Sequence, residues 1–486
     1  MPPISRRQFV QASAASAAAL ALPSYTHRPR RSPNEEIRVG VIGLRGRGRS
    51  HISGLHGLPN VRVVALCDVD RDVLDREAAR FAKRGEAVDA YVDLRRILER
   101  DDVDVVATAT PNHWHALIGV WACQAGKDVY LEKPVSHNVW EGRQIVLAAE
   151  RHGRIVQTGT QARSSTGLME ARAWLHEGHL GAIQLARGLC YKPRKSIGKV
   201  ARRTEVPETI DYDLWTGPAR MRPLMRERLH YDWHWDFETG NGDLGNQGIH
   251  QMDLCRWVLG QQQLSPRVVA VGGRFGYEDD ADTPNSMFVY HDYEPAPLVF
   301  EVRGLPRDKA AQESGWNSGM DRYRGAGIGV VVHCEHGHVT MPSYNEARAY
   351  DADGKEIERW SGSKNHFANF IDAVRSRRPG DLNSDILEGH LSSALCHTGN
   401  ISYLRGVQRG PEAIRDALAS TGPAAETFDR LRAHLEANEI DLDLDQAVLG
   451  AWLEMDPETE RFHGDEGANR LLTRPYRAPF TVPVQV

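Results

Sequence analysis

The sequence has 486 residues, of which 41% are hydrophobic and 26% are charged. This composition is typical of soluble globular proteins, and the length is too great for one ordinary core. A net charge of −5 with scattered arginines excludes the basic surface that nucleic-acid-binding proteins carry. The six cysteines lie far apart without CxxC or CxH pairs, which favours free thiols over a disulfide framework or a zinc site. We therefore expect at least two domains, no metal site and no nucleic-acid partner.

The N-terminus resembles an export signal. Ser5-Arg6-Arg7-Gln8-Phe9 precedes an Ala-rich apolar run over 12–22, and Ala19-Leu20-Ala21 offers a small-residue cleavage site. Adjacent arginines before a mild apolar run are typical of twin-arginine signals. The run is shorter than the roughly 20 apolar residues of a membrane span. We predict a signal at 1–22, a linker at 23–36, and a mature protein that is exported to the periplasm or another extracytoplasmic space without membrane insertion. A plain N-terminal tail is the alternative.

The next segment predicts a dinucleotide-binding turn. A β-prone run at 38–42 leads into Gly43, Arg45, Gly46 and Gly48, and a second apolar run at 61–67 ends at Asp68. In this order the turn brings backbone N–H groups to a pyrophosphate, and the acid can bind a ribose hydroxyl. Arg45 stands where the second glycine of the G-x-G-x-x-G pattern is usual, and Gly46 can supply the missing flexibility. A carboxylate at 68 favours NAD over NADP, although nearby arginines leave NADP open.

Alternating strand-like and helix-like runs continue to residue 158 and predict an α/β domain at 37–158 with a doubly wound parallel sheet. In such sheets, ligands bind at the carboxyl ends of the strands. The candidate cofactor contacts that fall there are Thr110, Asn112 and His113 after the run at 103–109, and Glu132 and Lys133 after the run at 128–131. Gln161, just past the strand predicted at 155–158, is a candidate substrate contact.

A polar and aromatic region at 230–253 predicts a site for a sugar. His234 and Trp235 belong to the most aromatic stretch of the chain, and Asp243 follows it. Asn246, His250 and Asp253 recur at intervals of three or four residues and share one face of a helix expected at 248–259. Sugar hydroxyls need paired donors and acceptors, and sugar C–H faces suit flat rings. Structural roles for Asp253, Trp235 and the neighbouring Trp233 remain open alternatives.

Strand-like runs separated by turns follow this helix, at 268–273, 285–291, 298–303, 330–334 and 338–341. They predict a second, α+β domain at 159–405 with an open, largely antiparallel sheet, with helices at 366–378 and 384–404 packed behind it. Residues 406–486 form an extension to which the sequence assigns no role.

The residues above resemble the glucose–fructose oxidoreductase/inositol dehydrogenase (Gfo/Idh/MocA) family. The matching landmarks are the glycine turn, Asp68, Thr110-Pro111-Asn112-His113, Glu132-Lys133-Pro134 and the run from Gly245 to Asp253. The resemblance implies that Lys133 lies beside the nicotinamide and that His250 orients or deprotonates the substrate hydroxyl. The family commonly has an aspartate where this chain has Asn246, and an amide cannot accept the proton. The resemblance also implies a homo-oligomer formed through the second sheet.

We therefore predict an NAD(P)-dependent oxidoreductase that transfers a hydride from a sugar, glycoside or polyol hydroxyl to a tightly bound nicotinamide. Lys133 and His250 would carry the proton, with Asn246 and Asp253 as further catalytic candidates. One alternative is redox-neutral glycoside cleavage through a transient keto-sugar. Another is a non-catalytic protein that binds NAD or sugar, because a Rossmann fold does not imply turnover.

Overall fold

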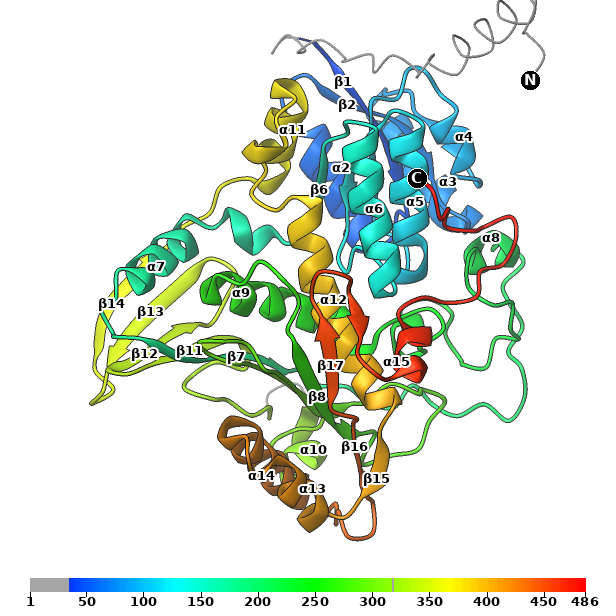
Figure 1. Ribbon diagram of the computed structural model, residues 1–486. Coiled ribbons are helices and arrows are strands. Elements are labelled where there is room, and N and C mark those ends of the chain that lie inside the picture. Colours follow the sequence, from blue (N-terminus) through cyan, green and yellow to red (C-terminus); the bar gives the residue numbers. More distant parts are fainter. Residues whose placement is uncertain (1–34, 317–318) are drawn as a thin grey trace, which may run out of the picture.

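The computed structural model describes residues 35–316 and 319–486 and contains two β-sheets with helices packed against them (Figure 1). The first sheet has the order β3-β2-β1-β4-β5-β6, and its strands are parallel. Its strands are β1 (Ile37–Ile42), β2 (Val61–Cys67), β3 (Asp89–Tyr91), β4 (Val105–Thr108), β5 (Asp128–Leu131) and β6 (Val156–Thr158). This is the doubly wound parallel sheet that the sequence predicts.

Helices cover both faces of the first sheet, which explains why β4, β5 and β6 are buried along their whole length. They are α2 (Arg47–His56), α3 (Arg71–Lys83), α4 (Arg95–Leu98), α5 (Asn112–Gln124) and α6 (Val139–Arg151), joined by α11 (His366–Ser376) from later in the chain. Side chains of α2, α3 and α11 share one apolar cluster with β1 residues Val39 and Val41. Side chains of α5 and α6 share another with Val106 and Val129 on the opposite face.

The second sheet has twelve strands, and ten of them follow the order β14-β13-β12-β11-β7-β10-β9-β8-β16-β15. The strands are β7 (Ile183–Tyr191), β8 (Arg267–Gly273), β9 (Ser286–His291), β10 (Leu298–Arg303), β11 (Ile328–Cys334), β12 (Gly337–Met341), β13 (Glu346–Asp351), β14 (Glu356–Ser361), β15 (Val407–Arg409), β16 (Ala447–Leu449), β17 (Leu453–Asp456) and β18 (Arg461–Phe462). Apart from the parallel pair β7–β10, neighbouring strands are antiparallel. The predicted fold class, with its largely antiparallel second sheet, is confirmed.

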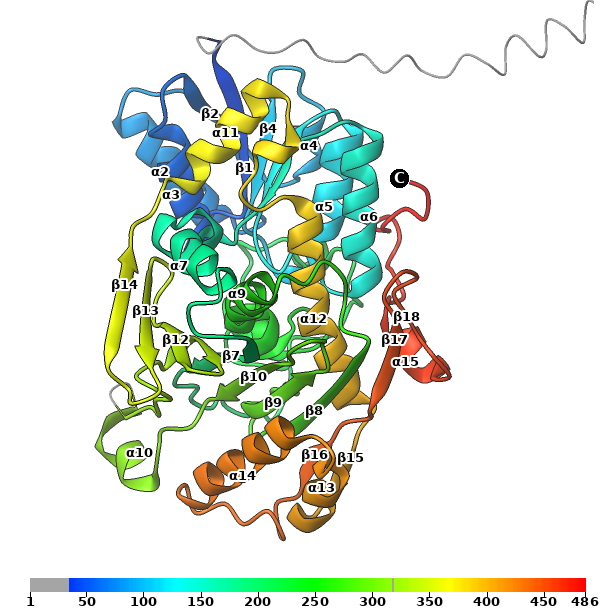
Figure 2. The ribbon, with the colours of Figure 1, turned by 60° about the vertical axis from the view of Figure 1, so that its left-hand side comes forward.

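Two groups of helices enclose this sheet from opposite sides (Figures 1 and 2). The helices of this part of the chain are α7 (Thr166–His176), α8 (Tyr212–Thr216), α9 (Ile249–Leu259), α10 (Lys309–Gly315), α12 (Ile386–Leu404), α13 (Pro411–Leu418), α14 (Gly422–Glu436) and α15 (Glu466–Leu471). Of these, α8 lies beside the first domain rather than against the second sheet (Figure 1). In β8, Val268 and Ala270 pack with the cluster that contains α7, α9 and α12. Val269 and Val271 point the other way and pack with α13 and α14, as the two-residue period of a strand requires.

The C-terminal extension therefore has a structural place that the sequence did not reveal. Its strands β16 and β17 pair with β8, and α13 and α14 cover the face of β8, β9 and β10 that lies away from the first domain (Figure 2).

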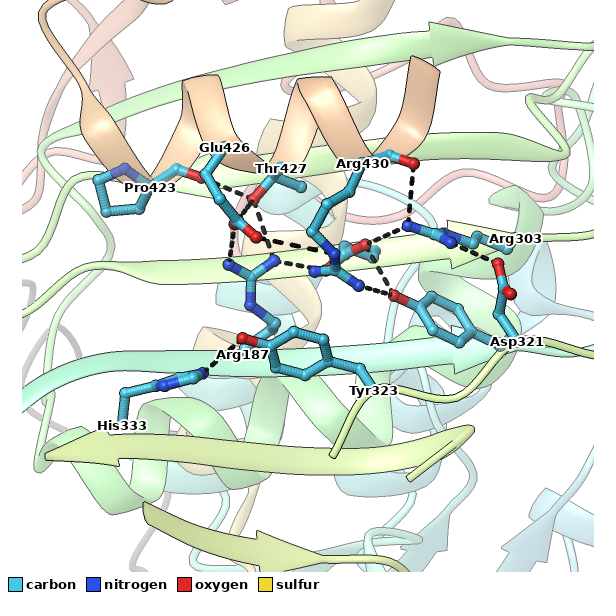
Figure 3. Close-up of polar contacts among 11 residues, drawn as sticks. Arg187, Arg303, Asp321, Tyr323, His333, Pro423, Glu426, Thr427 and Arg430 are labelled. Atoms are coloured by element: carbon cyan, nitrogen blue, oxygen red, sulfur yellow. Dashed lines mark hydrogen bonds and ion pairs between the residues drawn. The ribbon is translucent and has the colours of Figure 1, made fainter. Parts of the chain in front are cut away.

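A buried polar network fastens α14 to the sheet (Figure 3). The Glu301 carboxylate on β10, only 2% exposed, accepts hydrogen bonds from Arg187 at 2.5 Å and from Arg430 of α14 at 2.8 Å. The Tyr191 hydroxyl donates to the same carboxylate at 2.8 Å. Burial disfavours the charged form, but the surrounding guanidinium groups outweigh it and lower the pKa of Glu301.

Two features of the described residues as a whole bear on the sequence predictions. All six cysteines are buried free thiols. Among the described residues no helix combines the length and apolar character needed to cross a membrane.

Candidate active site

The glycine turn joins β1 to α2 in a backbone conformation that only glycines allow. Gly43 has φ +79°, and a Cβ there would lie 2.9 Å from backbone atoms of Ala109. A Cβ on Gly48 would lie 1.8 Å from the carbonyl oxygen of Gly43. Gly46, at φ +38°, precedes the first residue of α2 and provides no side-chain cap. The first N–H groups of α2 therefore have no capping side chain, as an anion-binding helix start requires.

Asp68 lies at the carboxyl end of β2, directly beside this turn. Its carboxylate accepts hydrogen bonds from the backbone N–H of Leu44 at 2.8 Å and of Asp70 at 3.0 Å. Burial raises the pKa of Asp68, partly offset by these two bonds. A carboxylate fixed here can bind ribose hydroxyls, and the turn beside it fits a pyrophosphate. This donor and acceptor set fits a dinucleotide.

The motif after β4 connects the two domains. The Asn112 amide donates to Asn241 at 2.9 Å, and the His113 ring nitrogens lie 3.0 Å from the Trp215 carbonyl and 3.2 Å from that of Thr239. Burial lowers the pKa of His113 to about 3. Thr110 and Asn112 line the pocket described below, but His113 does not. His113 thus contacts the second domain rather than the pocket.

Glu132 and Lys133 occupy the end of β5. The Glu132 carboxylate accepts a hydrogen bond from Arg47 at 2.6 Å and lies 3.1 Å from Nε2 of His51. The Lys133 ammonium donates to the backbone carbonyl of Asn246 at 2.5 Å. Burial, the largest influence, lowers the pKa of Lys133 against the opposing charge of Glu132. A half-buried lysine with a lowered pKa can exchange protons more readily near neutral pH.

The second domain contributes His250 to the candidate site. Residues 244–248 form a π-helical turn, a feature frequent at functional sites, and α9 starts directly after it. His250 is 6% exposed, its Nδ1 has no hydrogen-bond partner, and its ring lies 4.8 Å from that of Tyr344. Burial, followed by the charge of Lys133, keeps the pKa of His250 well below its usual value. The ring is therefore neutral at physiological pH.

These groups line one pocket of about 1080 Å³, at the upper end of the usual size for ligand sites. Twelve of the candidate residues from the sequence face it: Gly43, Arg45, Gly46, Asp68, Thr110, Asn112, Glu132, Lys133, Gln161, His234, Asn246 and His250. The Gln161 amide oxygen accepts from Arg47 at 3.4 Å. The His234 ring stacks on Trp233 with centroids 3.6 Å apart.

Gly48 and three other candidates besides His113 are placed elsewhere. Gly48 packs against Gly43 and supports the turn from behind. Asp253 is 1% exposed and forms a two-point ion pair with Arg163 at 2.9 and 2.8 Å. Asp243 pairs with Arg194 in the same way, and that guanidinium lies 4.6 Å from the ring of Trp235.

Asp253, Asp243 and Trp235 do not line the pocket. Their side chains hold the second domain together beneath it, so we now propose structural roles for all three.

The pocket also has walls that the sequence did not predict. Arg47 lies within the glycine turn, and its position at the start of the predicted helix is the sequence signal that could have identified it as a pocket residue. A long stretch at 205–229 and Phe480 near the C-terminus also contribute side chains, and neither carries a motif. No group of three or more His, Cys, Asp or Glu side chains suited to a metal occurs within residues 35–316 and 319–486.

Comparison with known proteins agrees with this geometry. Residues 37–160 match the oxidoreductase family with an NAD-binding Rossmann fold, and residues 181–300 match the C-terminal α/β domain of the same family. The chain belongs to the Gfo/Idh/MocA oxidoreductase family. This confirms the predicted family and NAD as the cofactor of the first domain. Residues 3–23 match the twin-arginine translocation signal sequence, which supports the export route predicted for 1–22; that segment lies outside the described residues.

Curated relatives and solved structures of Gfo/Idh/MocA proteins cover different parts of this chain. A glycosyl hydrolase family 109 protein from Shewanella sp. (strain W3-18-1) is 32% identical over 171 residues, 30% of this chain and 37% of its own length. An alpha-N-acetylgalactosaminidase from Shewanella oneidensis is 35% identical over 122 residues, 24% and 27% of the two chains. The chain thus spans about a third of the length of these relatives.

The WlbA dehydrogenase from Bordetella pertussis, solved with NADH and UDP-GlcNAcA, superposes with a TM-score of 0.52 at 20% identity. The match covers 74% of this chain and 94% of that one. At this level of identity the likeness shows the shared fold.

Proposed function

We propose that this Gfo/Idh/MocA protein transfers a hydride between NAD and a hydroxyl-bearing carbon of a sugar, glycoside or polyol. The observation that carries the proposal is the contact between Lys133 and Asn246. It brings the lysine at the end of β5 to the helix start that presents His250, in the pocket that the glycine turn also lines. Bound NAD would accept or return the hydride, and the residues of this chain would handle the proton.

Lys133 and His250 suit different parts of that proton transfer. The lowered pKa of Lys133 makes its neutral amine accessible, and this amine can take the proton from the hydroxyl that is oxidised. His250, kept neutral by burial, can hydrogen-bond the same hydroxyl and orient it. Asn246 uses its backbone carbonyl to hold the Lys133 ammonium, so its side chain need not accept a proton for this arrangement to work.

A sugar-like substrate is supported by the chemistry of the pocket walls. Gln161 and His250 offer polar atoms in the pocket that Lys133 also lines, and the His234–Trp233 stack offers flat rings. The names of the relatives and of the WlbA ligand refer to sugars and sugar nucleotides. We propose the periplasm as the destination of the exported protein, on the basis of the twin-arginine signal.

A second candidate function is redox-neutral glycoside cleavage, which the glycosyl hydrolase and galactosaminidase names of two relatives favour. Oxidation of a ring hydroxyl to a ketone would acidify the adjacent C–H. Loss of that proton would expel the glycosidic oxygen as an alcohol, water would add to the resulting double bond, and the hydride would return to the ketone. The sum is hydrolysis without net oxidation, which suits an exported protein that carries its nucleotide with it.

A lysine variant tests the common part of both candidates. Lys133→Met should lower kcat by about 10²- to 10⁴-fold, the usual contribution of a positioned acid–base group. It should still bind NAD, because the glycine turn and Asp68 are untouched. Lys199→Met, an exposed lysine paired with Glu278, is the matched control. Equal kcat in both variants would exclude Lys133 from the chemistry.

The two candidates differ in their products. The purified protein should first be denatured and its released nucleotide identified by mass spectrometry. The holoprotein should then be given free sugars and aryl glycosides while NADH absorbance is followed. Accumulating NADH indicates a dehydrogenase, whereas release of the aryl alcohol at constant NADH indicates redox-neutral cleavage. Neither signal on a broad panel of substrates would contradict the proposal.

A further inference from the structure

A stretch of the second domain lies across the nucleotide end of the pocket. We call residues 205–234 the cover segment; it connects β7 to α9 and includes the short helix α8. In Figure 1, α8 lies beside the helices of the first domain, and the C-terminal tail runs past it. Ile210, Leu224 and Leu229 of this segment line the same pocket as Asp68. The part of the pocket around Asp68 therefore has one wall from each domain.

The first anchor of the cover segment is Asp70, two residues beyond Asp68. Its carboxylate lies 2.9 Å from Nε2 of His230 and accepts from the Thr209 hydroxyl at 3.2 Å. Backbone hydrogen bonds join the same stretches, from the Arg71 N–H to the Thr209 carbonyl at 2.9 Å and from the Asp211 N–H to the Val69 carbonyl at 3.0 Å. The two domains thus form a small antiparallel bridge beside the ribose-binding carboxylate.

A second anchor lies at α8. The Trp114 indole N–H is 3.0 Å from the Leu214 carbonyl and 3.1 Å from that of Trp215. From the C-terminal tail, Arg477 donates to the Asp213 carboxylate at 2.5 Å and to the Gly217 carbonyl at 3.1 Å. The cover segment is therefore attached to α5 and to the tail as well as to Asp70.

An apolar cluster fills the space between these anchors. Ile210, Trp215, Leu224 and Leu229 are between 3% and 7% exposed and pack with Val69 of the first domain. Phe480 of the tail also lines the pocket and lies edge-on to Trp114, with ring centroids 5.4 Å apart. Opening this end of the pocket would expose the cluster and break the anchors, and burial of apolar surface opposes that.

We infer that the cover segment retains the nucleotide by closing the adenosine half of the site. The inference rests on the proposed function only in that NAD binds with its ribose at Asp68. Nucleotide release then requires the cover segment to separate from Asp70 and from Trp114. A protein exported already folded would keep its nucleotide through many turnovers, and the substrate would exchange without it.

The release rate of the nucleotide tests this directly and does not depend on turnover. Protein loaded with NADH is mixed with a large excess of NAD, and the decay of bound NADH fluorescence gives the rate. His230→Ala removes one anchor at Asp70, and Arg477→Ala removes the anchor at Asp213. Each should accelerate release by about tenfold or more, as expected for loss of a hydrogen bond to a charged group. The double variant should be faster than either one.

Met225→Ala is the matched control, because Met225 belongs to the cover segment but is 46% exposed; its release rate should equal that of the wild type. Arg477 lies on the tail, so Arg477→Ala keeps the test decisive should His230→Ala disturb folding. Variants that fold, bind NADH and release it at the wild-type rate would overturn the inference while leaving the proposed function intact. A wild-type protein that binds no NADH at all would instead refute the proposed function.

Discussion

Mild acid should destabilise this protein at a pH where most of its carboxylates are still ionised. His113, His291 and His397 are at most 3% exposed, and burial lowers the pKa of each from 6.5 to about 3. Below pH 6.5 the unfolded chain binds protons at these positions and the folded chain does not, so stability is fully present above pH 6.5 and falls as pH decreases. Each histidine contributes about 1.4 kcal/mol of loss at pH 5.5 and about 2 kcal/mol at pH 5.

The three together cost about 4 kcal/mol at pH 5.5, a large part of the roughly 5–15 kcal/mol by which proteins are stable. Asp282, whose pKa burial raises to about 6, takes up a proton in the folded state and offsets a part of this. Urea unfolding followed by tryptophan fluorescence at pH 7.5, 6.5 and 5.5 measures the effect. The midpoint should fall by roughly 1 M between the first and last pH.

A variant assigns the effect to a residue. His291→Leu replaces a fully buried imidazole with an apolar side chain, so the variant should lose about 1.4 kcal/mol less than the wild type on going to pH 5.5. His179→Leu, at a side chain 48% exposed, is the control. A midpoint that does not change between pH 7.5 and 5.5, or an unaltered pH response in His291→Leu, would refute the reasoning.

Three further predictions concern the turn, the network and the assembly. Gly48→Ala should abolish NADH binding measured by fluorescence, because its Cβ would overlap the Gly43 carbonyl, whereas Gly422→Ala, with open space around it, should bind normally. Glu301→Gln leaves buried guanidinium groups uncompensated and should cost about 3–5 kcal/mol. Hydrogen exchange in α14 should accelerate at least about 100-fold, and Asp429→Asn, in an exposed pair, should change it little; equal effects would contradict the role of the network. We expect the predicted homo-oligomer to use the strands that α13 and α14 leave free. Ile357→Arg on the edge strand β14, 44% exposed, should therefore lower the mass seen by light scattering; an unchanged mass or a monomeric wild type would contradict this.

The sequence by itself was sufficient for the first domain and for the core of the candidate site. Gly43, Asp68 and Lys133 follow the parallel strands β1, β2 and β5, and a parallel sheet brings all such strand ends to one edge. Their proximity therefore follows from the strand order alone. The helix with Asn246 and His250 was equally predictable, because its polar residues recur at helical spacing and Gly260 ends it with φ +69°.

Only the tertiary structure decided which polar residues reach the pocket. Asp253 and Asp243 look catalytic in the sequence, yet each is paired with an arginine that is 90 or 49 residues away along the chain. A local pattern shows that a carboxylate faces inward but not which cationic side chain it pairs with. In the same way, the amphipathic pattern of α13 and α14 requires a buried face without specifying that β8, β9 and β10 supply its partner.

The cover segment is the clearest example of this difference. Residues 205–229 of this segment form little regular structure and carry no motif, so neither periodicity nor spacing distinguishes them from an ordinary loop. Their position depends on Asp70, Trp114 and Arg477, which lie more than 90 residues away from the contacts they make. Long-range contacts of this kind exist only once both domains are folded, which is why the sequence specified the chemistry of the site and the tertiary structure specified its enclosure.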